Sequence, residues 1–248
     1  SKEELLKKVE DEARKVLEEW KEEVKRLIEE SKRVLDDWRR LVDEVSKDIK
    51  RVIDEARKDS EDKDLEEVAD RVRKLLEDNK RIVDEAIRRH EELLDENRKI
   101  VERVIELLEE LLDEIAKLTR SGKPEEELIR RAEELVRRLA EIVERVIRES
   151  RRIVEDNRRI SREVVERSKE IVDRLRKIVT ELIKKKDKDE DLKRVLEKLI
   201  KVIEKIVRLN EEALRKSNES LERIVKLNEE ALRELIRVIE RLVELVRK

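Results

Sequence analysis

The chain has 248 residues, of which 54% are charged and 37% hydrophobic, and its 66 basic and 69 acidic side chains give a net charge of −3. This near balance gives no electrostatic reason to bind nucleic acid or an anionic membrane surface. The absence of cysteine excludes disulfides and thiolate metal sites, and no apolar run approaches the roughly 20 residues of a membrane-spanning helix.

The set of residue types is restricted and favours helices. The sequence has one Gly and one Pro, and it lacks Phe, Tyr, Met, Cys and Gln. Three short polar breaks separate four segments in which apolar residues recur every three or four positions, which is the period of an amphipathic helix. We therefore predict helices over 2–58, 64–119, 124–185 and 190–248.

The short breaks also predict how these helices pack. A break of a few residues joins only helix ends that lie close together, so consecutive helices must be antiparallel neighbours. The apolar stripe of each segment has the width needed for a shared core, and the remaining positions are almost all charged. The sequence thus predicts an all-α fold, a single-chain antiparallel up-down-up-down four-helix bundle with very long, nearly straight helices, forming one domain over 1–248.

The expected helix starts carry capping signals. Ser1 with Glu4 and Asp64 with Glu67 have the spacing of a capping box. In a capping box, each of the two side chains accepts a hydrogen bond from the backbone N–H of the other residue. Pro124 suits the first turn of a helix, where a missing backbone N–H costs nothing. These signals agree with the limits given by the apolar pattern.

Polar or aromatic residues interrupt the apolar stripe of every segment in pairs 18 positions apart. The pairs are Trp20 and Trp38, Asn79 and Asn97, Ser150 and Ser168, and Asn210 and Asn228. Eighteen residues make five helical turns, so the two members of a pair point in the same direction about 27 Å apart. We expect two equivalent polar layers in the core, with the indoles as large core fillers rather than ligand platforms.

The spacing of further polar residues matches between the second and third segments. In the second segment, Asn79, His90 and Asn97 are separated by 11 and then 7 positions. In the third segment, Ser150, Asn157 and Ser168 are separated by 7 and then 11 positions. Antiparallel packing would place Asn97 beside Ser150, His90 beside Asn157, and Asn79 beside Ser168. We also expect Asn210 and Asn228 near the two outer levels, Ser217 level with Ser161, and Ser31 near His90.

Buried polar layers of this kind specify pairing. A buried amide or hydroxyl without a partner costs about 1–3 kcal/mol, so a slipped register would leave several such groups unpaired at once. Stability is lost relative to an all-leucine core, but a single alignment is selected. The alternative is that these residues are scattered and half-exposed at the edge of the stripe.

Catalytic and metal-binding interpretations find little support. His90 is the only histidine, and Ile87 occupies the position that a Glu-x-x-His metal motif of a helix bundle would require as Glu. Continuous helices offer few free backbone N–H groups for an oxyanion site, and no Gly-rich phosphate loop occurs. We expect no enzymatic activity, no cofactor, no metal and no small-molecule ligand, and a buried, neutral His90 that makes the fold sensitive to mild acid.

The restricted set of residue types, the 18-residue repeats and the matched Asn, Ser and His positions resemble computationally designed helical bundles with buried hydrogen-bond networks. The resemblance covers all 248 residues and rests on style rather than on a catalytic or binding motif. It implies a hyperstable, soluble structural scaffold without natural biochemical activity. The resemblance implies no natural location, and the protein is expected in the cytoplasm on recombinant expression. Two of the three connections depart from this style because they lack Gly and are heavily charged.

Two other classes of function compete with the scaffold. The resemblance also implies an interaction module, which could be a self-associating bundle, a heterodimer component or a helix-displacement switch. A monomer that needs no partner is favoured because each helix has one apolar stripe and no second apolar face. A lipid-surface protein would carry aromatic residues on its apolar faces and basic flanks, and both are largely absent.

Overall fold

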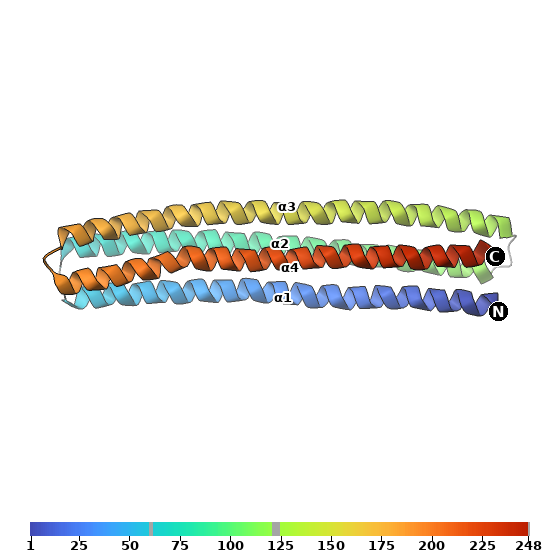
Figure 1. Ribbon diagram of the computed structural model, residues 1–248, viewed down its shortest axis with the longest axis horizontal. Helices are drawn as coiled ribbons and strands as arrows, with labels where there is room; N and C mark the ends of the chain where they lie inside the picture. Colours follow the sequence, from blue (N-terminus) through green and yellow to red (C-terminus); the bar gives the residue numbers. More distant parts are fainter. Residues whose placement is uncertain (60–61, 121–124, 248) are drawn as a thin grey trace. The chain divides into compact units, whose positions relative to one another are not determined.

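The computed structural model describes residues 1–59, 62–120 and 125–247 (Figure 1). It contains four helices, α1 (Lys2–Asp59), α2 (Lys63–Arg120), α3 (Glu125–Lys185) and α4 (Glu190–Arg247), and no strand in the described residues. Every limit lies within one residue of the position predicted from the apolar pattern. The all-α four-helix fold is confirmed.

The starts of α1 and α2 show which capping signals act. The Ser1 hydroxyl accepts a hydrogen bond from the Glu4 backbone N–H at 3.4 Å, as expected. At α2 the prediction was wrong, because the Asp62 carboxylate accepts from the backbone N–H of Asp64 at 2.9 Å and the Asp62 carbonyl accepts from Glu66 at 3.1 Å. Asp62 is therefore the N-cap, and α2 begins one residue earlier than predicted.

The connection before α4 uses the same chemistry. The Asp189 carboxylate accepts from the backbone N–H of Leu192 at 3.1 Å, and the Asp189 carbonyl accepts from Lys193 at 2.9 Å. In the same connection, Lys186 forms ion pairs with Asp62, which caps α2, and with Asp64 at 3.5 Å. The hydrogen bond from Lys186 is the main cause that lowers the pKa of Asp62. The predicted role of Pro124 lies outside the described residues.

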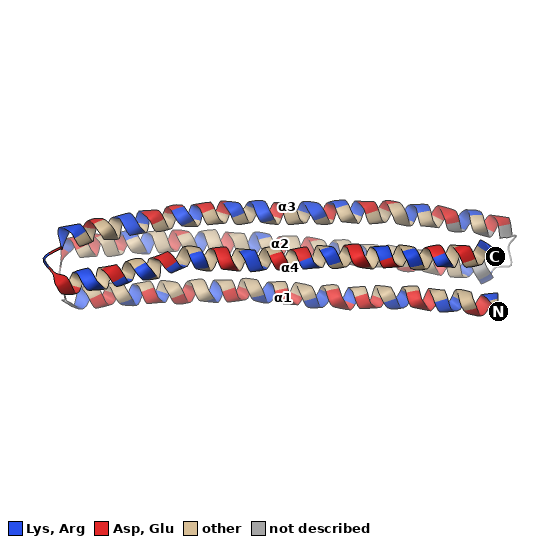
Figure 2. Cartoon of the chain, viewed as in Figure 1, with Lys and Arg blue, Asp and Glu red and all other residues tan. Residues whose placement is uncertain are grey.

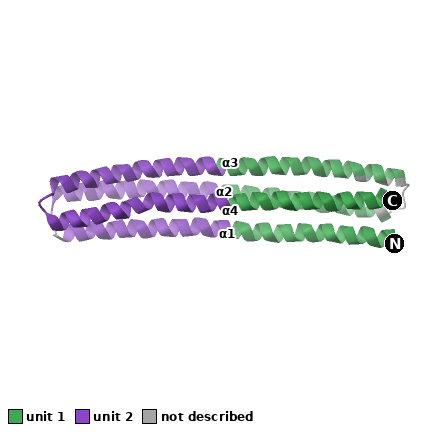
Figure 3. Cartoon of the chain, viewed as in Figure 1, with its two compact units in different colours: residues 1–30, 92–156, 220–248 green, residues 31–91, 157–219 purple. Residues whose placement is uncertain are grey.

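The packing contacts divide the chain into two compact units (Figure 3). Unit 1 comprises Ser1–Glu30, Glu92–Asp156 and Ser220–Lys248, and unit 2 comprises Ser31–Glu91 and Asn157–Glu219. Each unit contains a segment of all four helices, because every helix passes from one unit into the other. Both chain ends belong to unit 1, where the Lys2 ammonium donates a hydrogen bond to the Val246 carbonyl at 3.2 Å.

Ion pairs at the helix junctions give the order of the helices in each unit. In unit 1 they join α1–α2, α2–α3, α3–α4 and α4–α1 through Arg14–Asp113, Arg152–Glu96, Arg151–Glu229 and Arg241–Glu12. In unit 2 the same four junctions contain Arg39–Asp84, Arg89–Glu163, Arg176–Glu204 and Lys198–Glu55. Neighbours in sequence are thus neighbours in space, and α2 lies diagonally opposite α4 in both units.

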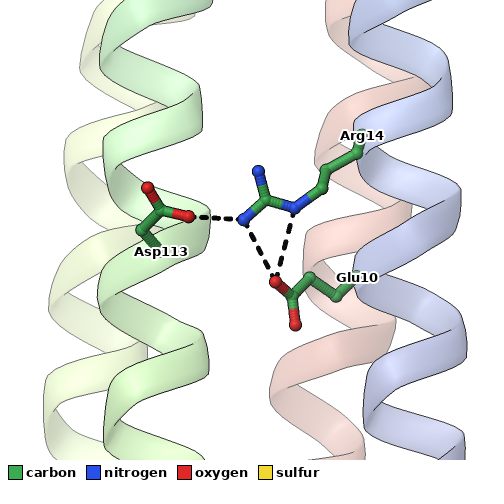
Figure 4. A network of polar contacts seen from close by, with 3 residues as sticks. All are labelled: Glu10, Arg14 and Asp113. Carbon is green, nitrogen blue, oxygen red and sulfur yellow. Dashed lines mark hydrogen bonds and ion pairs between the residues drawn. The ribbon is translucent and has the colours of Figure 1, made fainter.

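Acidic and basic residues are intermixed along every helix (Figure 2). Arg14 of unit 1 shows how a junction is held (Figure 4). Its guanidinium donates to Asp113 of α2 at 2.5 Å and to Glu10 of its own helix at 3.1 Å, and the bond to Asp113 is the main cause that raises the pKa of Arg14. Exposed pairs of this kind contribute only about 0–1 kcal/mol each, so the apolar core must supply most of the stability.

That core consists of leucine, isoleucine, valine and alanine from all four helices, together with Trp20 and Trp38 of α1. In unit 2, Ile49, Leu65, Leu175 and Leu196 are each at most 2% exposed and belong to one continuous cluster. Burial of each such leucine or isoleucine contributes about 1.5–3 kcal/mol. None of the described helices has a stretch apolar and long enough to cross a membrane.

Candidate functional site

Eleven polar side chains are buried in the described core. They are Ser31, Asn79, His90, Asn97, Ser150, Asn157, Ser161, Ser168, Asn210, Ser217 and Asn228, each at most 8% exposed. They are the same eleven residues that the sequence assigned to polar layers, so their predicted burial is confirmed. The alternative of half-exposed residues at the edge of the stripe is wrong. Trp20 and Trp38 are also buried, at 2% and 1% exposure.

Four of these buried residues of unit 2 are linked to one another by hydrogen bonds and are called here the unit-2 quartet. It consists of Trp38, Asn79, Ser168 and Asn210, one residue from each helix. The Asn210 amide nitrogen donates to the Asn79 side-chain oxygen at 3.2 Å and to the Ser168 hydroxyl at 2.8 Å. The Trp38 indole N–H donates to the Asn210 side-chain oxygen at 2.8 Å. One asparagine of α4 therefore binds a side chain from each of the other three helices.

The unit-1 quartet repeats these residues 18 positions away in every helix, as Trp20, Asn97, Ser150 and Asn228. The Trp20 indole N–H donates to the Asn228 oxygen at 2.9 Å, and the Asn228 amide donates to the Asn97 oxygen at 3.1 Å. Here the two quartets differ, because the Ser150 hydroxyl and the Asn97 amide nitrogen are buried without a hydrogen-bond partner. The sequence predicted equivalent layers. The two layers have the same residue types, but only the unit-1 quartet contains buried polar groups without a hydrogen-bond partner.

A third group of polar residues belongs to unit 2 and has no 18-residue counterpart. His90 Nδ1 and the Ser217 hydroxyl are hydrogen-bonded at 2.8 Å. Asn157 donates its amide N–H to the Asn218 side-chain oxygen. The Ser161 hydroxyl is one donor shared between two acceptors, the Asn157 carbonyl at 2.8 Å and the Asn218 side-chain oxygen at 3.2 Å. These five residues are called here the His90 cluster.

Asn218 is the functional position that sequence reasoning missed. It is half-buried, and it follows the predicted Ser217 immediately, off the centre of the apolar stripe of α4. The signal that could have found it is the run Ser217-Asn218 within an otherwise charged stretch. Ser31, which was placed near His90, is buried in α1 of the same unit.

Two of the three predicted side-by-side pairs are bonded to residues of α4, and in the third pair only Asn97 is, through Asn228. Asn79 and Ser168 are joined by Asn210 as their common partner. His90 and Asn157 bond to the adjacent α4 residues Ser217 and Asn218. The contacts of Asn210 agree with the predicted common level of Asn79, Ser168 and Asn210, and they supply the hydrogen-bond partners that the sequence left open.

Burial governs the chemistry of His90. The side chain is 2% exposed, and desolvation of its charged form lowers its pKa to about 4. Its Nε2 atom is buried without a hydrogen-bond partner. The imidazole is therefore neutral at pH 7 and is a poor acceptor of a proton in the folded chain.

The described core contains amide, hydroxyl and indole groups that form hydrogen bonds between helices. No group of three or more His, Asp or Glu side chains that could hold a metal ion occurs among the described residues. No protein-family model matches the chain, and no curated protein or solved structure matches it either. The function must therefore be inferred from the geometry of the two quartets and the His90 cluster.

Proposed function

We propose that the chain is a de novo designed structural scaffold without natural biochemical activity, whose helix pairing is specified by its buried polar side chains. The observation that carries this proposal is the set of hydrogen bonds that the Asn210 side chain makes. Its amide bonds to α2 and α3 and its carbonyl oxygen accepts from α1, so one residue fixes the level of all four helices in unit 2.

The energetic argument compares the correct pairing with a slipped one. A slip of α4 would leave Trp38, Asn79 and Ser168 without partners inside an apolar core. Each unpaired buried group costs about 1–3 kcal/mol. The sum is a large part of the roughly 5–15 kcal/mol that stabilises an ordinary domain, so slipped pairings are not populated.

The experiment separates specificity from stability by comparing two variants. The single variant N210L leaves three buried groups of the unit-2 quartet unpaired and is expected to lower the free energy of unfolding by about 2–5 kcal/mol. The apolar variant replaces both quartets and carries the substitutions W20F, W38F, N79L, N97L, S150A, S168A, N210L and N228L. Removal of all partners together is nearly neutral or stabilising, so this variant should unfold at or above the wild-type denaturant midpoint.

Pairing is measured separately, by native mass spectrometry and by spin-label distances between exposed positions of α1 and α4 within one unit. The wild type should be a single species of 30.0 kDa with one distance distribution. The apolar variant should show several distances or oligomers. If the apolar variant keeps one mass and one distance, the buried polar residues do not specify pairing and the proposal fails.

A second function, an interaction module whose α4 exchanges with a competing helix, is favoured by one specific observation. The eight hydrogen bonds described above between polar core side chains on different helices all have one partner on α4. Helices α1, α2 and α3 together thus present a set of polar groups that fits a helix with asparagine at two positions 18 residues apart.

Its test uses the full chain and a labelled peptide of residues 190–247. Exchange would appear as a complex of one chain with one peptide in native mass spectrometry. The matched control is the same peptide with the N210L and N228L substitutions, which should bind at least tenfold more weakly because it leaves the indoles and the facing asparagines unpaired. Binding of neither peptide, or of both equally, favours the scaffold alone.

A further inference from the structure

The junction of α2 and α3 in unit 2 carries an excess of positive charge. A groove of about 570 Å³ is lined there by Arg71 and Lys74 of α2 and by Arg174 and Lys177 of α3. Leu75 and Ile178 form its apolar part, and Glu181 is the one acidic residue that lines it. All four cationic side chains are exposed.

These four cations differ from most of those at the helix junctions, where basic residues are matched by acidic ones. No ion pair or hydrogen bond joins any of the four side chains to another described residue. Acidic residues close to Lys74 in sequence bind other cations, since Asp70 pairs with Arg73 at 3.6 Å and Asp78 with Arg81 at 2.5 Å. Four cations thus face one another across a groove to which Glu181 contributes the one carboxylate among the lining residues.

The corresponding groove of unit 1, between the same two helices, provides an internal comparison. It is lined by Glu110, Glu114 and Glu141 together with Arg138 and Arg145, so its charge is slightly negative. Its volume is about 290 Å³. The positive excess is therefore a property of the unit-2 groove and not of the α2–α3 junction in general.

We propose that the unit-2 groove between α2 and α3 binds a compact multivalent phosphate anion from solution. Two arginines supply planar guanidinium groups that bond two phosphate oxygens at once, and two lysines supply point charges. The volume lies within the range of about 300–1,000 Å³ that is usual for small-ligand sites. The balanced charge of the whole chain predicted no such ligand, because a total does not describe the local distribution.

Isothermal titration calorimetry with sodium triphosphate at low ionic strength tests the proposal. The wild type should bind one triphosphate per chain, with an affinity that falls as salt is added. The variant R71Q/R174Q should bind at least tenfold more weakly, because two charge-assisted bidentate contacts are lost. K74Q/K177Q should weaken binding less, because lysine makes no bidentate contact.

The matched control is R103Q/R137Q, which removes two exposed arginines from α2 and α3 in unit 1. It should change the affinity by less than twofold. An equal loss in R71Q/R174Q and R103Q/R137Q would show general electrostatic attraction only and would overturn the proposal, as would the absence of saturable binding to the wild type. Vesicles that carry phosphatidylinositol phosphates form a second arm, and sedimentation with them without binding of free triphosphate would also overturn it.

Discussion

Ser150 and Ser168 occupy equivalent positions one 18-residue repeat apart, and only Ser168 has a partner. The Ser168 hydroxyl accepts from Asn210 at 2.8 Å, whereas the Ser150 hydroxyl is buried without a hydrogen bond. We expect S168A to lower the free energy of unfolding by about 1–2 kcal/mol, and S150A to raise it by up to the roughly 1–3 kcal/mol that the unpaired hydroxyl costs. Denaturant unfolding of both variants measures the difference, and equal losses would contradict the geometry.

His90 determines a pH dependence whose sign follows from its lowered pKa. The pKa is about 4 in the folded chain and about 6.5 in the unfolded chain, so the unfolded chain binds the proton first as pH falls. Stability is complete above pH 6.5, declines between 6.5 and about 4, and levels off below. The expected loss is roughly 2 kcal/mol at pH 5 and about 3 kcal/mol in total, measured by denaturant unfolding across this range.

The control for this prediction is the H90Q variant, which cannot titrate near neutral pH. It is expected to be less stable than the wild type at pH 7, since it must repack around Ser217, but its stability should be nearly constant between pH 7 and pH 5. If wild type and H90Q lose stability in parallel over that range, another group controls the acid response.

At the scale of single elements, the start of α4 shows how local chemistry defines a helix. Because the Asp189 carboxylate accepts from the Leu192 backbone N–H at 3.1 Å, D189A should lower the free energy of unfolding by about 1 kcal/mol. The matched control is D187A, which removes an exposed carboxylate that pairs with Lys193 at 3.2 Å and should cost less than about 0.5 kcal/mol. Thermal unfolding by circular dichroism separates the two.

The helix limits could be predicted to within one residue because they depend on local sequence. Apolar period and polar breaks act over a few turns, and the fold requires nothing else to end a helix there. The exact cap at α2 could not be predicted in the same way. Asp62 and Asp64 both have the right side chain, and Lys186, which bonds to both, comes from a connection more than 120 residues away.

At the scale of the whole molecule, the two units differ in how completely their quartets are satisfied. The unpaired Asn97 amide and Ser150 hydroxyl lower the stability of unit 1 locally, by about 1–3 kcal/mol each. Hydrogen exchange should therefore be faster in helical segments around Asn97 and Ser150 than around Asn79 and Ser168. The S150A variant should slow exchange around position 150, and equal protection of the two units in the wild type would contradict the prediction.

The sequence by itself determined the helices, the eleven buried polar positions, and the common level of Asn79, Ser168 and Asn210. These follow from periodicity, since residues 18 apart share one face of a helix, and from the short connections, which force neighbours to run antiparallel. The tertiary structure alone decided that α2 is diagonal to α4 and that Asn210 and Asn228 are the common partners of the quartets. The physical reason is that a hydrogen bond depends on side-chain direction and on distances of a few tenths of an ångström across the core. The same reason explains why Ser150 and Ser168, identical in sequence pattern, differ in the bonds they make.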